Sequence, residues 1–437
     1  MSLLLACLPL LLPVQSQSLP PASDIATRRA APNIIVIVAD DFGVDMLNAY
    51  GEGTAPACTP NIDALASQGM LFRNAWTNPI CSPTRAALLT GRYGFRTGIG
   101  TVVGNNEAGL PLSEEAMPEM LLGYASTAVG KWHLSGNLGL DHPRDQGFDH
   151  FAGFIRGAIQ NYFQWPKVVD GANTGSSVYS TTDIANEAIN AVGSLPSPWY
   201  VQVNFNAPHS PWHVPPTNLC PGLPCANNWC GNLPTNPSNR EMGKAMVEAM
   251  DTELGRILAS VHQVDPNAIV VFMGDNGTPA QLSEAPFLPN HAKGTMFEGG
   301  VNVPLIISGP GILAADCNAL VSSVDLFATF AQLAHVRAGT EDSVSMVPYF
   351  HAPHLRLREM TYTETFSPNG GTLPFNQHSR CVREERYKLI RITGQSDQLY
   401  DLQQDPFETN NLLPGLNTMQ QDAFDRLLAE FVRLGVD

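Results

Sequence analysis

A cysteine at residue 81 is the first residue whose surroundings point to chemistry. It lies in the stretch NPICSPTRAALLTGRY, where Pro83 fits the first turn of a helix and Gly91 can end it. Cys81 and Arg85 are four residues apart, so they share a face of that helix. A helix N-terminus beside an arginine stabilises an anion such as a thiolate. Taken alone, the segment fits a packed core cysteine, half of a disulfide, a metal ligand or a nucleophile.

Two pairs of oxygen-bearing side chains follow apolar runs of strand length. Asp40 and Asp41 follow NIIVIVA, and Asp275 and Asn276 follow the run in VVFMGDNG. Ligands bind at the carboxyl ends of strands in open α/β sheets, and oxygen ligands suit a hard cation. Each pair alone would also fit a turn or a helix cap. Together they predict a metal site, with Asn276 buried and unmodified although NGT is a glycosylation sequon.

Three further segments supply cations and proton carriers. GKWHLSG contains Lys131 and His133, which we expect to share a face of an extended segment. NAPHSPWHVPP contains His209 and His213 in a proline-stiffened loop, and HAKGTMFEGG contains Lys293. A lone histidine is more often a structural residue, so these segments gain weight only through the carboxylate pairs and the cysteine motif.

Strands that alternate with helices position these side chains. The residues of the first run, Asn33–Ala39, are continuously apolar and β-branched, which is typical of a buried parallel strand. Similar apolar runs predict further strands at Ala125–Val129, Pro198–Asn204, Ala268–Met273 and Val303–Ser308. Helices are predicted in TPNIDALASQG and over Ser113–Leu122 and Asn239–Val261. The fold class is therefore α/β, a large and mostly parallel sheet sandwiched by helices.

The pattern changes after about residue 340. Short strand-like segments at Glu359–Thr365, Arg386–Ile392 and Gln398–Leu402 precede a helix over Thr418–Leu434. They predict a small C-terminal antiparallel sheet plus one helix. We therefore expect a signal-like segment at 1–23, a catalytic α/β domain at 30–340 and an α+β subdomain at 341–437.

The composition and the N-terminal segment limit the cellular locations and the classes of partner that we expect for this protein. The 437 residues carry a formal net charge of −16, which argues against nucleic acid as the main partner. The apolar start followed by Ser, Gln and Pro is typical of an export signal, and Cys7 also gives it a lipoprotein-like pattern. No later run is long enough to span a bilayer. We expect an exported protein, periplasmic or extracellular, or a lipid-anchored one.

Eight cysteines are compatible with disulfides in an exported chain. Cys220, Cys225 and Cys230 crowd one loop, so one local bridge is expected there, although sequence does not fix its partners. Their spacing has no CxxC pattern and no nearby HxxxH, which makes a zinc site the weaker reading.

The cysteine segment CSPTRAALLTGR resembles the type I sulfatases of the alkaline-phosphatase superfamily. NIIVIVADDFG, TPNIDALASQG, GKWHLSG, APHSPWH, GDNG, HAKGTMFEGGVNVPLI and LYDLQQDPFETNNL are similar to further signatures of that family, in the same order. The resemblance covers about residues 32–412. Within the family, the order of the histidine, GDNG and EGG segments resembles the arylsulfatase B and bacterial arylsulfatase branch.

The resemblance implies a modified nucleophile and one metal ion. A maturation enzyme would oxidise Cys81 to formylglycine, whose hydrate attacks sulfur. One divalent cation, usually Ca²⁺ in this family, would be held by Asp40, Asp41, Asp275 and Asn276, with residue 81 also touching it.

The resemblance also implies roles for the basic residues. Arg85 and Lys131 would steady the hydrated aldehyde. Lys131, Lys293 and His209 would bind the sulfate oxygens and the leaving group, and His133 would take a proton from the second hydroxyl. The implied activity is hydrolysis of sulfate monoesters of an aryl group, another small molecule or a carbohydrate.

Two alternatives remain. A phosphodiesterase or phosphonate monoester hydrolase of the same superfamily would use a related site. A binding protein could also keep the sulfatase fold without the chemistry.

Overall fold

The computed structural model describes residues 31–220, 222, 225, 228–339 and 341–437. The predicted export segment and Cys7 lie outside these residues. Residues Pro32–Asp437 form one compact unit.

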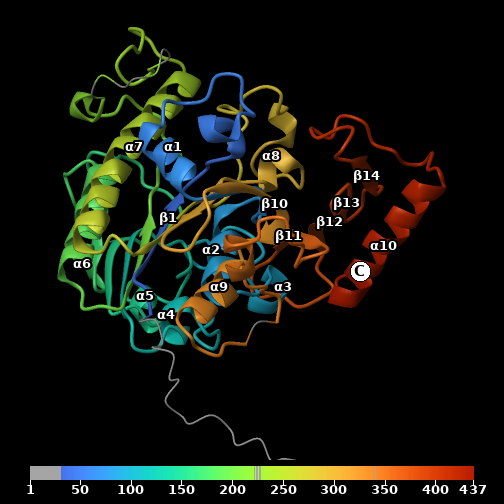
Figure 1. The fold of residues 1–437 in the computed structure, drawn as a ribbon, viewed down its shortest axis with the longest axis horizontal. Coiled ribbons are helices and arrows are strands. Elements are labelled where there is room, and N and C mark those ends of the chain that lie inside the picture. Colours follow the sequence, from blue (N-terminus) through green and yellow to red (C-terminus); the bar gives the residue numbers. More distant parts are fainter. Residues whose placement is uncertain (1–30, 221, 223–224, 226–227, 340) are drawn as a thin grey trace, which may run out of the picture. The chain divides into compact units, whose positions relative to one another are not determined.

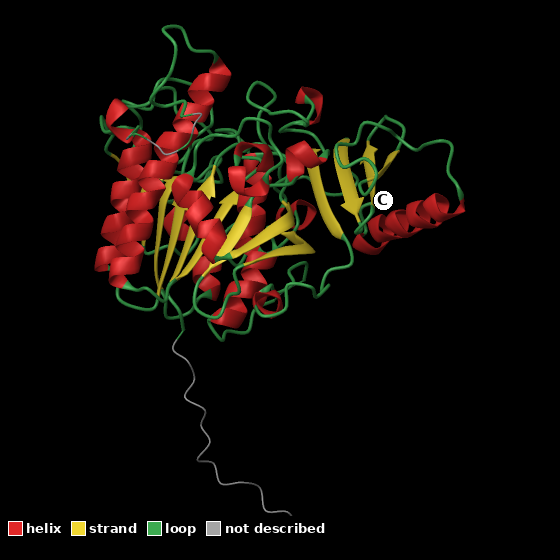
Figure 2. Ribbon diagram, turned by 45° about the horizontal axis from the view of Figure 1, so that its top comes forward, coloured by secondary structure: helices red, strands yellow, loops and turns green. Residues whose placement is uncertain are grey.

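A ten-stranded mixed sheet is the centre of this unit (Figures 1 and 2). Its strands lie in the order β10-β2-β9-β8-β1-β7-β3-β4-β5-β6. Strands β8, β1, β7, β3 and β4 are parallel neighbours, whereas β9 runs antiparallel to both β2 and β8. The strand bounds are β1 Ile34–Ala39, β2 Met70–Trp76, β3 Ala125–Lys131, β4 His150–Phe154, β5 Val168–Val169, β6 Ala172–Asn173, β7 Trp199–Asn204, β8 Ile269–Gly274, β9 Leu305–Ser308 and β10 Ala315–Ser322.

Helices cover both faces of this sheet because its central strands are apolar on both sides. In β1, Ile35 and Ile37 pack in the core that contains α6 (Ser180–Ser194) and α7 (Asn239–Val264). Ile34, Val36 and Val38 point into the opposite core, with α2 (Cys81–Thr90) and α9 (Asp325–Leu333). The remaining helices of the described chain are α1 Pro60–Gln68, α3 Gly94–Thr97, α4 Met117–Met120, α5 His142–Asp145 and α8 Glu298–Val301, with α10 described below; short 3₁₀ helices span Val44–Met46, Asn48–Tyr50, Thr217–Leu219, Pro289–His291 and Val347–Phe350.

A four-stranded antiparallel sheet follows in the sequence, in the order β11-β12-β13-β14. Its strands are Thr361–Ser367, Gln377–Arg383, Tyr387–Ile392 and Gln398–Asp401. The last helix, α10 (Thr418–Leu434), packs Leu427 and Phe431 against side chains of this sheet (Figure 1). The predicted fold class is therefore confirmed.

Buried charges join this smaller sheet to the segment around α8. Lys388 of β13 lies 3.0 Å from Glu298 and 2.7 Å from Glu408, and Arg383 of β12 lies 2.8 Å from Glu298. Glu408 also accepts the backbone N–H of Glu298. We call Glu298, Arg383, Lys388 and Glu408 the C-terminal charge cluster.

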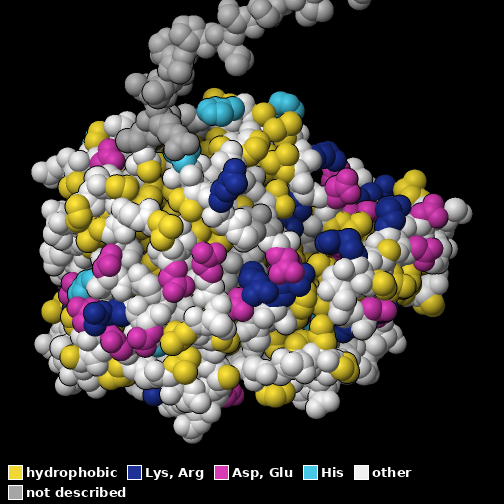
Figure 3. All heavy atoms as spheres, turned by 90° about the horizontal axis from the view of Figure 1, so that it is seen from below, with side chains coloured by type: hydrophobic (Ala, Val, Ile, Leu, Met, Phe, Trp, Pro, Cys, Tyr) yellow, Lys and Arg dark blue, Asp and Glu magenta, His cyan; other side chains and the backbone are white. Residues whose placement is uncertain are grey.

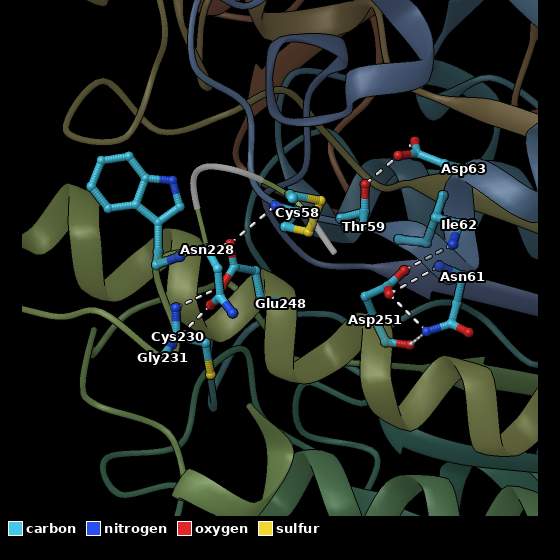
Figure 4. The surroundings of a disulfide bond; sticks show 12 residues. Cys58, Thr59, Asn61, Ile62, Asp63, Asn228, Cys230, Gly231, Glu248 and Asp251 are labelled. Atoms are coloured by element: carbon cyan, nitrogen blue, oxygen red, sulfur yellow. Dashed lines mark hydrogen bonds between the residues drawn. A yellow bond between two sulfur atoms is a disulfide. The ribbon is translucent and has the colours of Figure 1, made fainter. Parts of the chain in front are cut away.

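Two disulfides hold the loop before α7. Cys220 pairs with Cys230, which is the expected local bridge, and Cys225 pairs with the distant Cys58. Glu248 of α7 accepts the backbone N–H groups of Cys58 and Cys230, and Figure 4 shows it between these two segments. The loop is therefore fixed to α7 by hydrogen bonds and to the segment around Cys58 by a disulfide.

One predicted helix is much shorter than expected. Ser113–Leu122 contains only the single turn α4, Met117–Met120. Pro118 explains the error, because proline fits the first turn of a helix but breaks an interior, and a helix starting at Ser113 would put it in the interior. The structure instead begins the helix at the residue before the proline.

No helix in the described part of the chain is long and apolar enough to cross a membrane. On the face drawn in Figure 3, basic and acidic side chains are interspersed.

Candidate active site

The two oxygen-bearing pairs lie side by side, as predicted. Strands β1 and β8 are parallel neighbours with Ala39 opposite Gly274, so the residues that follow each strand meet at one edge. The backbone N–H of Asp41 donates to Asp275 Oδ1 (3.0 Å), and Asn276 Nδ2 donates to Asp41 Oδ1 (2.9 Å). Asp41 has a φ of 67°, a left-handed conformation that ordinary residues adopt only where the surroundings hold them. Asn276 is fully buried, as expected for an unmodified sequon.

Cys81 is the first residue of α2, and the helix brings Arg85 into the same site. The guanidinium of Arg85 lies 2.8 Å from Asp275 Oδ2 and donates to the carbonyl of Lys131 (3.1 Å). The side chains of Cys81 and Arg85 are buried. Among the described residues Cys81 has no disulfide partner, which argues against the disulfide reading of this cysteine.

Lys131 and His133 reach the site from the end of β3. Lys131 Nζ lies 2.6 Å from Asp40 Oδ2. His133 Nδ1 lies 3.3 Å from Cys81 Sγ. The predicted geometry was wrong in one respect: the strand ends at Lys131, and His133 has a left-handed φ of 62° in place of an extended one. A turn therefore aims the imidazole at residue 81.

His209 and Lys293 complete the group on the side of Asp41. Lys293 Nζ forms an ion pair with Asp41 Oδ1, and His209 Nε2 lies 4.0 Å from Asp41 Oδ2. His209 Nδ1 donates to the carbonyl of Ser210 (2.8 Å), which leaves Nε2 free to act as donor or acceptor toward a ligand. All the predicted site residues are thus brought together.

The oxygen atoms of this site fit a hard cation. Ligand atoms of Asp40, Cys81 and Asp275 lie within 4.8 Å of one another. Among the described residues, Asp40 Oδ1 and Asn276 Oδ1 are buried and have no hydrogen-bond partner. A buried acceptor without a partner is costly, and a cation held by carboxylate and amide oxygens would remove that cost.

Burial and close charges shift the pKa values of the carboxylates in opposite directions. Burial alone would raise the pKa of Asp40, but Lys131, followed by other nearby cations, holds it well below its usual range. Burial raises the pKa of Asp275 to about 6, and the negative charge of Asp40 adds to this shift against the effect of Arg85.

The pKa values of the groups near residue 81 are shifted as well. Burial raises the pKa of the Cys81 thiol, although Lys131 and Lys293 oppose the rise. Burial, with Lys131 and Arg85, lowers the pKa of His133 well below its usual range. The unmodified thiol is therefore a poor nucleophile at neutral pH, whereas His133 is a neutral imidazole that can accept a proton.

Two supporting hydroxyls were missed from sequence. Ser82 Oγ donates to the carbonyl of His133 (2.9 Å), and Thr278 Oγ1 donates to Asp45, which joins the turns after β8 and β1. The only available signal was the closeness of these hydroxyls to CSPTR and GDNG in the chain.

The family comparison identifies the chain as a hydrolase of sulfuric esters. The model of the sulfatase family matches residues 32–336, and the model "N-sulphoglucosamine sulphohydrolase, C-terminal" matches residues 290–432. The chain belongs to the sulfatase family, within the alkaline-phosphatase superfamily, and is a sulfatase.

Characterised relatives include two mammalian sulfatases. Arylsulfatase G of Rattus norvegicus is 29% identical over 432 residues, which covers 84% of this chain and 77% of that protein. N-acetylgalactosamine-6-sulfatase of Sus scrofa is 32% identical over 376 residues, covering 76% of this chain and 68% of that protein. The finer expectation of an arylsulfatase B-like branch stays a prediction.

Solved structures share the fold. Ps i-CgsB in complex with k-i-k-neocarrahexaose superposes with a TM-score of 0.78 at 25% identity, covering 92% of each chain. A structure in complex with its substrate D-glucosamine-2-N,6-O-disulfate gives a TM-score of 0.74 at 20% identity and covers 92% of this chain and 97% of that one.

Proposed function

We propose that the protein hydrolyses sulfate monoesters of carbohydrates through a formylglycine made from Cys81. The observation that carries this proposal is the position of residue 81, beside both the neutral imidazole of His133 and the acceptor-rich group that fits a cation. Carbohydrate is favoured as the substrate class because one relative acts, by its name, on an N-acetylgalactosamine 6-sulfate.

Asp40, Asp41, Asp275 and Asn276 would hold one divalent cation of the Ca²⁺ type. When bound, the cation would offset negative charge on the sulfate group and on residue 81. Lys131 and Lys293 add two further positive charges on the same side, each already placed by its ion pair with an aspartate. A monoanionic ester is therefore attracted into a site that is otherwise rich in carboxylates.

The modified residue would supply two hydroxyls on one carbon, one to attack sulfur in line and one to expel the sulfate afterwards. His133 would accept the proton of the second hydroxyl, since its Nδ1 lies 3.3 Å from the Sγ that the modification replaces. Ser82 fixes the backbone of His133 for this step. Arg85, held by Asp275 and by the carbonyl of Lys131, would orient the hydrated group.

The leaving alcohol needs a proton as its bond to sulfur breaks. His209 in its doubly protonated form would give it from Nε2 and become neutral, because Nδ1 keeps its proton in the hydrogen bond to the carbonyl of Ser210. Lys293 lies on the same aspartate as His209 and would bind the departing oxygen or the sulfate. The organic group of the substrate would therefore lie on the His209 side.

Mass spectrometry of the peptide that carries residue 81, together with activity, tests this proposal. The protein is produced with and without a co-expressed formylglycine-generating enzyme and treated with a chelator. We expect turnover to follow the fraction of formylglycine and to fall on metal removal. Full activity of material that retains only the thiol would contradict the mechanism.

A parallel assay separates this function from the superfamily alternatives. Matched sulfate and phosphate monoesters, phosphodiesters and phosphonate monoesters are compared by kcat/KM on the same preparation. We expect the sulfate ester to lead, and a wide preference for phosphorus would point to the phosphodiesterase or phosphonate hydrolase alternative.

A further inference from the structure

Four aromatic rings pack together beside the His209 loop and take no part in the chemistry proposed above. The rings of Tyr162 and His213 lie 4.4 Å apart, and Phe163 lies 5.1 Å from Tyr179 and 5.4 Å from His213. Tyr162 and Tyr179 are buried, whereas His213 is half-buried and Phe163 is 44% exposed. The cluster therefore turns one histidine and one phenylalanine toward solvent.

Both ring nitrogens of His213 have hydrogen-bond partners within the protein, so this residue is not placed to act as an acid or base. Its Nδ1 lies 2.9 Å from the carbonyl of Pro211, which requires Nδ1 to donate. Its Nε2 lies 3.1 Å from the hydroxyl of Tyr179 and accepts from it. Both nitrogens of the neutral imidazole are thus occupied, so the face of the ring is the part left for a ligand.

Residues 155–163, which carry part of this aromatic cluster, contact the His209 loop at one end and His133 at the other. Tyr162 donates its hydroxyl to the carbonyls of Asn206 (2.7 Å) and His209 (2.5 Å). At the other end, the carbonyl of Ile155 accepts the backbone N–H of His133 (3.1 Å). Gly157 lies so close to the His133 ring that a Cβ there would be 2.3 Å from Nε2. Residues 155–163 therefore form a wall from His133 to His209.

We propose that Phe163 and His213 form a platform for the sugar ring that carries the sulfate. A pyranose presents an apolar face of C–H groups, and such a face packs well on exposed aromatic rings. The inference rests on the proposed function, which puts the leaving alcohol beside His209. Gln160 and Gln164 are exposed on the same segment and offer amide groups to sugar hydroxyls, which an aryl ring lacks.

Truncation of the exposed ring tests the platform. Phe163→Ala is compared with Phe163→Tyr, which keeps a ring, and with Val432→Ala, which removes an exposed apolar side chain on α10. The substrates are methyl pyranoside monosulfates, 4-nitrophenyl sulfate and the ringless n-propyl sulfate. We expect Phe163→Ala to lower kcat/KM for the pyranoside about 10-fold, mainly through KM, and to leave n-propyl sulfate within about twofold. Phe163→Tyr and Val432→Ala should behave like the wild type.

A binding measurement keeps the test independent of turnover. In a Cys81→Ser background, which cannot form formylglycine from cysteine, the Kd of the same pyranoside sulfates is measured by NMR titration. Phe163→Ala should raise this Kd about 10-fold. Absence of turnover in formylglycine-bearing wild type would reject the proposed function, and the platform would then be judged by binding alone.

The outcomes separate the alternatives. Equal losses on all three esters, or no loss in either kcat/KM or Kd, would overturn the platform. A loss confined to 4-nitrophenyl sulfate would assign the rings to aryl groups and overturn the pyranose assignment.

Discussion

Two buried groups of charge in this molecule differ in how their oxygens are used. In the C-terminal charge cluster, Glu298 contacts Lys388 with one oxygen and Arg383 with the other. Glu408 contacts Lys388 with one oxygen and accepts a backbone N–H with the other. Every carboxylate oxygen of that cluster therefore lies within ion-pair or hydrogen-bond distance of a donor from the same chain, although Glu408 Oε1 has only the ion pair with Lys388 and no hydrogen bond.

The active site has three acids and three cations in close contact, against two of each in the cluster, but some of its acceptors are left without partners. Asp40, Asp41 and Asp275 pair with Lys131, Lys293 and Arg85, yet Asp40 Oδ1 and Asn276 Oδ1 have no partner among the described residues. The comparison teaches that buried charge alone does not mark a site. Single buried acceptors without a partner also occur elsewhere, at Gln146 and Asn302, so what distinguishes the site is two of them beside three carboxylates at one strand edge.

Loss of residue 81 should give the largest effect. Cys81→Ala is expected to lower kcat by about 10⁴-fold or more, because it removes the nucleophile, while thermal unfolding changes little. Cys317→Ala is the matched control, since Cys317 is also buried and unpaired but lies in β10. A drop in stability larger than that of the control would favour a structural role for Cys81.

Breaking the C-terminal charge cluster should act on stability. Lys388→Met leaves two carboxylates without their shared cation and is expected to cost about 3–5 kcal/mol of unfolding free energy. Denaturant unfolding measures this, and turnover assayed well below the melting temperature should fall far less than in Cys81→Ala. Arg433→Met, which removes an exposed pair with Glu430, is the control and should cost about 0.5 kcal/mol. Equal effects of the two substitutions would show that the cluster is not structural.

The same cluster predicts a pH dependence of stability. Burial raises the pKa of Glu408 to about 7, from a usual value of 4.5, although Lys388 opposes the rise. Between these two pH values the native state keeps a proton that the unfolded chain releases. The contribution of Glu408 to the free energy of unfolding is therefore full below about pH 4.5 and is lost as the pH rises through 7. It amounts to at most about 3 kcal/mol.

Glu408→Gln tests that dependence. The melting temperature of the wild type should fall between pH 5 and pH 8, and the substitution should flatten this fall, because glutamine does not titrate. Glu115→Gln, a change of an exposed acid, is the control and should keep the wild-type slope. An unchanged slope in Glu408→Gln would remove this group as the cause.

The smallest effect is expected at the start of α10. The side chain of Asn417 accepts the backbone N–H of Gln420, and Asn417→Ala should cost about 1 kcal/mol of stability. Turnover at low temperature should stay at the wild-type level, since the cap touches no residue of the active site. Asn417→Ser, which keeps a capping oxygen, should be nearly neutral. A change in kcat would show that the smaller sheet and the site are coupled more closely than the charge cluster alone implies.

Asp40, Asp275 and Cys81 were predictable because each one stands next to a strong local signal, whereas the basic residues of the site gained their roles only from the family resemblance. Asp40 and Asp275 end continuous apolar strands, and Cys81 begins a helix with proline in its first turn. The conformation of His133 was not predictable, because its left-handed turn depends on contacts with Ile155 and Gly157, which are distant in the sequence.

Helices α6 and α9 were overlooked although their patterns are helical, whereas two strands escaped prediction because their patterns are mixed. Strand β2 contains Arg73 and Asn74 and β10 contains Asp316 and Asn318, so neither shows a continuous apolar run. The pairing of Cys58 with Cys225 was also beyond the sequence, because it depends on which loops the fold brings together. Local patterns thus identified the catalytic edge of the sheet better than the elements at its side.

The burial of α2 has a consequence for the order of events in the life of the chain. All ten residues from Cys81 to Thr90 are buried, and only 4% of Cys81 is exposed. If Cys81 is converted to formylglycine as proposed, the modifying enzyme must bind the CSPTR segment while it is still extended, so conversion would have to precede the docking of this helix. Folding and modification would then compete kinetically. A chain that folds before it is modified would retain its thiol. The fraction of active molecules in a preparation would therefore depend on the relative rates of modification and folding, and not on the stability of the folded protein.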